Sequence, residues 1–133
     1  MEAAENKQLM QEIFAGLSQG DSRLFVEHMT DDFRWHVSGS SRWSRTYDGK
    51  QAVLSELFGA LRKRITGRIK TIPERFIADG EFVVVQARGD NTTVAGKPYN
   101  NRYCFVFRVT DGKLREVTEY MDTELVRTAL DSD

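Results

Sequence analysis

The chain contains little cysteine, little proline and no excess of charge of either sign. Cys104 is the one cysteine among 133 residues, so no disulfide can form within the chain. Because Cys104 lies in an apolar segment, we expect a buried thiol and not a nucleophile. The formal net charge of -1 gives no electrostatic reason to expect nucleic acid or an anionic membrane as a partner.

Long hydrophobic runs and cofactor motifs are also missing. No apolar segment approaches the ~20 residues of a membrane span, and the amino terminus lacks the basic start and apolar run of a secretion signal. The sequence has no cluster with metal-ligand spacing and no glycine-rich phosphate loop. We therefore expect a cytoplasmic protein that needs neither a metal nor an organic cofactor, folded as one domain over residues 1–133.

Apolar residues recur at helical spacing in the first half of the chain. They predict a helix over residues 3–18, ended by Gly20. Asp21 is expected to be the N-cap of a second short helix, which carries Leu24, Phe25, His28 and Met29. A third helix is expected to begin at Gly49. It closes on Arg62, Lys63 and Arg64, which either form an anion site or remain solvated where cations favour a helix C-terminus.

The remaining segments predict strands and tight turns. Residues 33–37, 69–77, 82–87 and 99–122 have strand patterns, and Pro73 marks the second of these as an edge or bulged strand. Asp79-Gly80 and Asp111-Gly112 are expected to form hairpin turns. A short helix follows Asp122. This order predicts an α+β domain with three N-terminal helices on one face of a curved, mainly antiparallel sheet, and a pocket between the two layers.

Five segments resemble one known family. These are the helix break at Gly20-Asp21, DDFRWH at residues 31–36, YDGK at 47–50, FRVTDGKL at 107–114 and EYMD at 119–122. In this order they resemble the SnoaL-like branch of the nuclear transport factor 2-like superfamily, which includes ketosteroid isomerases, polyketide cyclases and limonene-epoxide hydrolases. The resemblance implies a cystatin-like half-cone fold, and also a homodimer through the open sheet face, which the apolar strand at residues 105–109 independently suggests.

The charged residues Arg88 and Asp90 are the first candidate site. On an extended strand they share a face, so they either enter the apolar cone or form a solvated pair beside a turn. Resemblance to limonene-epoxide hydrolases implies that Glu119 or Asp90 activates water while Arg88 orients them. The tyrosine and asparagine that position water in that family have no match around residues 35–41.

His36 is a further candidate base, by comparison with ketosteroid isomerases, whose base lies early in the first strand. Its ordinary pKa suits proton transfer at neutral pH. However, His36 lies on the opposite strand face from Trp35 and Val37, so it could equally be a polar residue of the outer face.

Aromatic and amide side chains are candidates for ligand binding. Asn101 and Tyr103 share a strand face and could hold a polar group of an otherwise apolar ligand. Trp35, Trp43 and Tyr47 either bind a flat or alicyclic molecule or fill the core. Asp122 resembles an acid–base position of some polyketide cyclases, although helix capping also explains it.

Two functions fit this sequence. The leading hypothesis is an isomerase, cyclase or epoxide-hydrolase-like enzyme that uses cofactor-independent general acid–base catalysis on a small apolar or alicyclic molecule. The alternative is a ligand-binding or dimeric interaction module that does not turn its ligand over. An enzyme would require Arg88, Asp90 and Glu119 at one cavity, whereas a binding protein needs only the aromatic lining.

Overall fold

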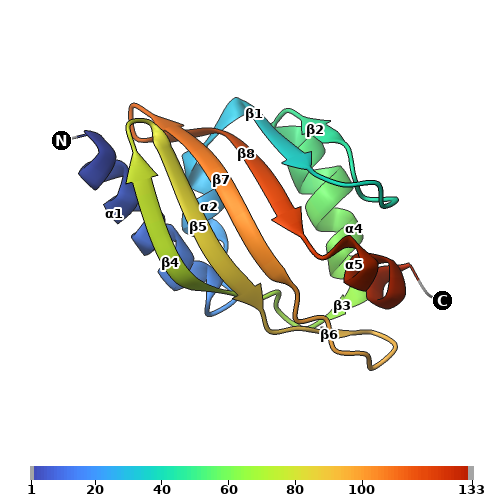
Figure 1. Ribbon diagram of the computed structural model, residues 1–133. Helices are drawn as coiled ribbons and strands as arrows, with labels where there is room; N and C mark the ends of the chain where they lie inside the picture. The colour runs from blue at the N-terminus through green and yellow to red at the C-terminus, as the bar shows by residue number, and fades with distance from the viewer. Residues whose placement is uncertain (1, 132–133) are drawn as a thin grey trace.

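Residues 2–131 are described by a computed structural model in which helices cover one face of a curved six-stranded sheet (Figure 1). The strand order is β2-β1-β8-β7-β5-β4, and a separate two-stranded sheet joins β3 and β6. The predicted α+β half-cone is confirmed. The single-domain prediction over residues 1–133 also includes residues 1, 132 and 133, which lie outside the described residues.

Two of the three predicted N-terminal helices are continuous and the third is composite. Helix α1 spans Glu2–Leu17 and α2 spans Arg23–His28. The third consists of α3 (Lys50–Ala52), the π-helical segment η1 (Val53–Phe58) and α4 (Gly59–Arg64). The π-helical turn was not expected from the sequence, because its apolar spacing matches that of an α-helix. Among the described helices, none is long and apolar enough to cross a membrane.

Two predicted helix caps have different outcomes. Asp122 caps α5 (Thr123–Leu130), because its Oδ1 accepts hydrogen bonds from the backbone N–H groups of Glu124 at 3.0 Å and Leu125 at 3.2 Å. The N-cap of α2 is Ser22 and not Asp21. The Asp21 carboxylate still accepts a hydrogen bond from the backbone N–H of Arg23, so the prediction was wrong by one position.

The main sheet is antiparallel except where β1 (Met29–Val37) runs parallel to β8 (Lys113–Met121). The other strands are β2 (Thr46–Asp48), β4 (Thr71–Asp79), β5 (Phe82–Gly89) and β7 (Arg102–Thr110). The short pair is β3 (Ile65–Thr66) and β6 (Thr92–Thr93). β2 was not predicted, since three residues are too few to show alternation.

The turns and the edge strand follow from local sequence. Asp111 and Gly112 have positive φ values of 53° and 68° between the paired residues Thr110 and Lys113, which confirms the predicted two-residue turn. In the other hairpin Asp79 pairs with Phe82, so that turn lies one residue later than predicted. Edge strand β4 has the expected register shift next to Pro73.

The core lies between the inner sheet face and the helices. The Phe14 ring of α1 lies 5.9 Å from the ring of Phe76 on β4 and from the rings of Phe105 and Phe107 on β7. Alternation along β5 and β7 buries the inward side chains Val83, Val85, Ala87, Phe105, Phe107 and Val109.

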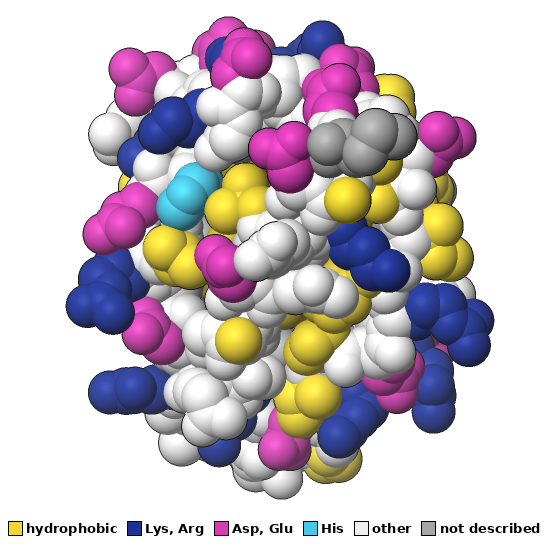
Figure 2. Space-filling model, turned by 90° about the vertical axis from the view of Figure 1, so that its left-hand side faces the viewer, with side chains coloured by type: hydrophobic (Ala, Val, Ile, Leu, Met, Phe, Trp, Pro, Cys, Tyr) yellow, Lys and Arg dark blue, Asp and Glu magenta, His cyan; other side chains and the backbone are white. Residues whose placement is uncertain are grey.

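The outer sheet face carries the opposite residues of the same strands. Cys104 on β7 is only half-buried there, whereas the sequence predicted a buried thiol. The cause is its register, which places it between Gln86 and Tyr120 and not in the core. On the side of the molecule shown in Figure 2, acidic and basic side chains are interspersed, in agreement with the small net charge.

Candidate functional site

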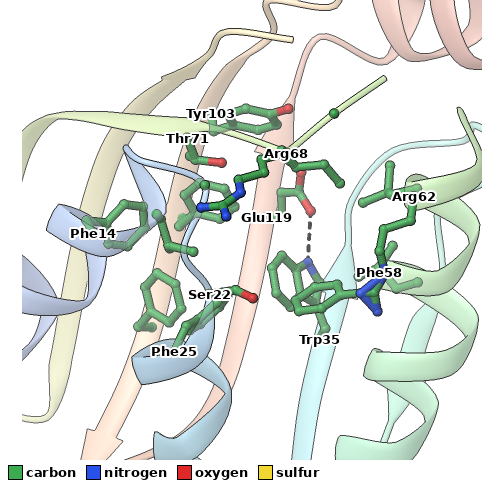
Figure 3. Close-up of a pocket in the computed structure, with 18 residues that line it drawn as sticks. Phe14, Ser22, Phe25, Trp35, Phe58, Arg62, Arg68, Thr71, Tyr103 and Glu119 are labelled. Carbon is green, nitrogen blue, oxygen red and sulfur yellow. Dashed lines mark hydrogen bonds between the residues drawn. The ribbon is translucent and has the colours of Figure 1, made fainter. Parts of the chain in front are cut away.

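A cavity of about 310 Å³ opens between the inner sheet face and the helices (Figure 3). Its volume is in the range of small-molecule sites. Most of its lining is apolar and comes from α1, α2, η1 and β7, including Phe14, Leu17, Phe25, Leu57, Phe58, Phe105 and Phe107. The cavity therefore favours an apolar ligand, and its few polar groups must determine what else that ligand carries.

The carboxyl group of Glu119 borders this cavity. Strand β8 positions it between Val37 of β1 and Phe105 of β7, and its backbone carbonyl accepts hydrogen bonds from Ser38 N at 3.0 Å and Ser38 Oγ at 2.8 Å. Trp35 Nε1 donates a hydrogen bond of 2.8 Å to Glu119 Oε1 (Figure 3). The carboxyl group is thus fixed by its own strand, β8, and by one hydrogen-bond donor from β1. The residues around it are mainly apolar.

Burial raises the pKa of Glu119 to about 7, and the hydrogen bond from Trp35 partly opposes this effect. Glu119 is half-buried, and its side chain faces the cavity. With a pKa near 7, both the ionised and the protonated forms are populated at neutral pH. Such a group can accept and return protons, which an ordinary surface glutamate does poorly at this pH.

Tyr103 places a hydroxyl group in the same cavity. Burial, followed by the neighbouring Tyr99 and Glu119, raises the pKa of Tyr103 well above its ordinary value. Its ring stacks on Phe105 with centroids 5.1 Å apart, which fixes its orientation. The hydroxyl therefore keeps its proton at neutral pH, and a hydrogen bond with the Tyr99 hydroxyl also favours the protonated form.

A smaller cavity of about 60 Å³ lies against the first. Glu119, Tyr103, Leu57, Leu61 and Ile69 line both spaces. The small cavity also contacts Trp43, Asn91 and Tyr99, and the rest of its wall is mainly aliphatic. Its size suits one or two water molecules and not a substrate.

The structure contradicts the placement of Arg88 and Asp90 inside the cone. Both side chains are exposed and line neither cavity, and Arg88 Nε lies 3.8 Å from Glu74 Oε2 on the outer face. The reason is strand alternation, since Ala87 points inward and Arg88 must point outward. Asp90 follows the end of β5, where its backbone N–H bonds to the Lys70 carbonyl.

His36 also lies outside the cavities. Its Nε2 is 2.7 Å from Glu116 Oε2 and its Nδ1 is 2.7 Å from Thr46 Oγ1, both on the outer sheet face. This is the outer-face position that strand alternation allowed. Of the four predicted catalytic residues, only Glu119 faces the cavity, so the structure does not bring the others together with it.

The predicted ligand-binding residues also divide. Trp35 and Tyr103 line the large cavity, and Trp43 lines the small one. Tyr47 is buried outside both, with its hydroxyl donating to the Trp43 carbonyl at 3.1 Å. Asp122 is occupied as the cap of α5.

Asn101 is fully buried and does not line either cavity, so its predicted role in ligand binding is wrong. Its Nδ2 donates to the Asp122 carbonyl at 3.1 Å and to Tyr99 Oη at 3.3 Å. Its Oδ1 accepts from the backbone N–H groups of Arg102 at 2.8 Å and Asp122 at 3.1 Å. The amide therefore joins the start of β7 to the end of β8 and has no polar atom left for a ligand.

Sequence reasoning missed several residues around the cavity. Arg68, Ser22 and Thr71 supply polar groups to its lining, together with Arg62, which the sequence offered as part of a possible anion site. Arg68 and Ser22 lie in segments without periodicity, where sequence offers no signal for a shared site. Within the described part of the chain, no group of acidic, histidine or cysteine side chains is arranged to hold a metal ion.

Comparisons with known proteins agree with this architecture. The family model for the SnoaL-like domain matches residues 10–117. An NTF2-like protein from Burkholderia xenovorans LB400 is 25% identical, with 98% of both chains covered and a TM-score of 0.75. A protein from Jannaschia sp. CCS1, provisionally named a SnoaL-like polyketide cyclase, is 19% identical, with 99% of this chain and 95% of that chain covered and a TM-score of 0.79.

A third similar structure is TerC, co-crystallised with polyporic acid. It is 21% identical and has a TM-score of 0.79, with 96% of this chain and 98% of that chain covered. A search of curated protein sequences found no significant match.

Proposed function

The chain belongs to the SnoaL-like domain family, and from that premise we propose that it is a small-molecule enzyme in which Glu119 exchanges protons with a bound substrate. One observation carries the proposal. Glu119 is a carboxyl group with a pKa of about 7 that faces an apolar cavity large enough for a small molecule.

The reaction we propose is a proton transfer by one carboxyl group. Ionised Glu119 removes a proton from an acidic C–H group of the substrate, and protonated Glu119 returns it at a second position or to the product. Trp35 Nε1 stabilises the ionised form throughout, since it donates to Oε1. Tyr103 supplies a hydroxyl that can bond to a substrate oxygen on which negative charge develops.

This assignment favours an isomerase or cyclase over an epoxide-hydrolase-like reaction. The hydrolytic scheme implied by resemblance uses two carboxyl groups and an arginine, but Arg88 and Asp90 lie on the outer face. A single carboxyl group in the cavity is sufficient for removing and returning one proton.

The proposal predicts that the protein accelerates the base-catalysed ring opening of 5-nitrobenzisoxazole, an uncharged bicyclic probe. The base takes the proton from the ring carbon, the N–O bond breaks, and a coloured cyanonitrophenolate is released. We expect the rate to rise with pH and to level off above an apparent pKa of about 7. The measurement is initial rate against pH from 5 to 9.

Probe binding must be measured in the same experiment, by quenching of tryptophan fluorescence. A probe that binds but reacts no faster than in buffer would contradict the assignment of Glu119 as a base and support the ligand-binding alternative. A rate that follows an apparent pKa near the ordinary glutamate value would also contradict it.

We also propose that two copies of the chain associate through the outer sheet face. Ile77 and Phe82 are 52% and 46% exposed there, beside the half-buried Val84 and Val106 of the central strands. A second copy would cover these side chains. We expect light scattering at micromolar concentration to give a dimer, and a monomer would contradict the proposal.

A further inference from the structure

Three charged side chains line the large cavity, and they are arranged by sign. Glu119 lies inside, whereas Arg62 and Arg68 are exposed at the opening. The two arginines come from different segments, Arg62 from α4 and Arg68 from the loop between β3 and β4. Figure 3 shows their guanidinium groups on different sides of the space in front of Glu119.

Neither guanidinium group is occupied by another described side chain of the protein. Over residues 2–131, neither the Arg62 nor the Arg68 side chain makes an ion pair or a hydrogen bond. By contrast, Arg108 Nε lies 2.8 Å from Glu81 Oε1, and Arg45 Nη2 lies 2.9 Å from Glu56 Oε1. The two cations at the cavity opening thus remain available to a ligand.

The position of Arg68 is fixed by close contact with the loop between α1 and α2. Gly20 has a φ of +77°, and a Cβ atom added there would lie 2.6 Å from Arg68 Cβ. The aliphatic part of the Arg68 side chain therefore packs directly on the Gly20 backbone. Any residue other than glycine at position 20 would collide with it. This contact holds the arginine at the cavity, whose lining also includes Ser22.

The interior of the cavity excludes an anion, but its opening attracts one. An anion placed inside would lose its hydration among phenylalanine rings and would be repelled by ionised Glu119. At the opening, the same group would stay partly hydrated and could accept hydrogen bonds from two guanidinium groups.

We propose that the substrate is an apolar molecule with an anionic group at one end, and that Arg62 and Arg68 bind this group while the other end reaches Glu119. The inference rests on the proposed function, because it names the substrate class of the same cavity. Arg62 and Arg68 are thus specificity-determining residues. They also set the direction in which the ligand enters, with its apolar end first.

The test uses two fluorescent probes that differ only in an anionic group, 8-anilinonaphthalene-1-sulfonate and uncharged N-phenyl-1-naphthylamine. Binding is measured for the wild type and for R62Q, R68Q and the double variant. The matched control is K63Q, which removes an exposed positive charge next to Arg62 that does not line the cavity. All substituted side chains are exposed, and circular dichroism verifies that each variant is folded.

We expect the double variant to bind the sulfonate roughly tenfold more weakly, with each single variant in between. The uncharged probe should bind all proteins within about twofold, and K63Q should match the wild type. The wild-type preference for the sulfonate should shrink at 1 M salt, where the Debye length falls to about 3 Å. Displacement of the sulfonate by 1-naphthoate and by 1-naphthyl phosphate then distinguishes a carboxylate from a phosphate substrate.

Equal weakening of both probes, or a K63Q effect as large as that of the double variant, would overturn the inference. This failure differs from failure of the proposed function. If the arginines show no anion preference but the benzisoxazole probe still reacts through Glu119, only the substrate class is wrong. If binding of the sulfonate probe depends on both arginines but Glu119 exchanges no proton, the cavity binds anionic ligands without catalysis.

Discussion

Replacement of Glu119 by glutamine (E119Q) is expected to lower turnover of 5-nitrobenzisoxazole by at least about 100-fold, the lower range for loss of a general base. Glutamine has nearly the same volume, and its carbonyl oxygen can still accept the hydrogen bond from Trp35 Nε1. It cannot accept a proton at any pH of the assay. The pH dependence near 7 should disappear with the rate.

The matched control is E116Q. Glu116 lies on the same strand but faces outward, next to His36, so the charge change is the same and the cavity is untouched. We expect E116Q to keep the wild-type rate and its pH dependence within about twofold. A similar loss in both variants would contradict a specific role for Glu119.

The same E119Q substitution should increase stability above neutral pH. The folded-state pKa of Glu119 is about 7 and the ordinary value is 4.5, so between these values the folded state binds more protons than the unfolded state. Stability of the wild type therefore falls as pH rises from 4.5 towards 7, by up to about 3 kcal/mol. E119Q avoids this loss, and urea unfolding at pH 5 and pH 8 measures the difference.

Loss of rate together with gain of stability would distinguish a functional carboxyl from a structural one. A structural glutamate should lower both quantities when it is removed. A wild-type stability that does not change relative to E119Q between pH 5 and pH 8 would contradict the raised pKa.

Replacement of Asn101 by alanine (N101A) is expected to reduce the free energy of unfolding by about 3 kcal/mol. The substitution removes the acceptor of two backbone N–H groups and the donor to the Asp122 carbonyl, all near the completely buried Asn101. Those backbone groups would lose their partners in a region that water enters poorly. The measurement is urea unfolding at pH 7.

N100A is the control for this prediction. Asn100 is exposed, and its Oδ1 accepts one hydrogen bond from the backbone N–H of Asn91 at 3.0 Å. We expect N100A to cost no more than about 1 kcal/mol. An equal loss of unfolding free energy in the two variants would contradict the structural role of Asn101. An N101A variant with normal stability but weak probe binding would instead support a role of Asn101 in ligand binding.

Glu119 and Tyr103 show what the sequence could predict about the site. Period-two alternation along β7 and β8 orders the side chains of each strand into two faces, and resemblance to SnoaL-like proteins indicated Glu119. The raised pKa could not be predicted, because it results from burial, which depends on how β8 packs against segments distant in the sequence. The fold itself was predictable because helix spacing, turn residues and strand alternation all agree.

Arg88, Asp90 and Asn101 show where sequence reasoning fails. Both faces of β5 carry apolar residues, so alternation alone could not decide which face lines the cone, and Arg88 belongs to the outer one. Asn101 was assigned to ligand binding because the sequence does not show its hydrogen bonds to the Asp122 backbone. Asp122 lies 21 residues away, and only the folded structure brings the two residues together. Arg68 was missed because its place at the cavity depends on contact with Gly20.

The most direct test of this account is the titration of the Glu119 carboxyl group itself. Carbon-13 NMR of protein labelled at glutamate side-chain carboxyl carbons, with E119Q to identify the signal, gives this pKa without any substrate. We predict a midpoint at about pH 7. A midpoint near 4.5 would mean that Glu119 is ionised throughout the neutral range like a surface glutamate, and the proposed proton exchange in the cavity would be wrong.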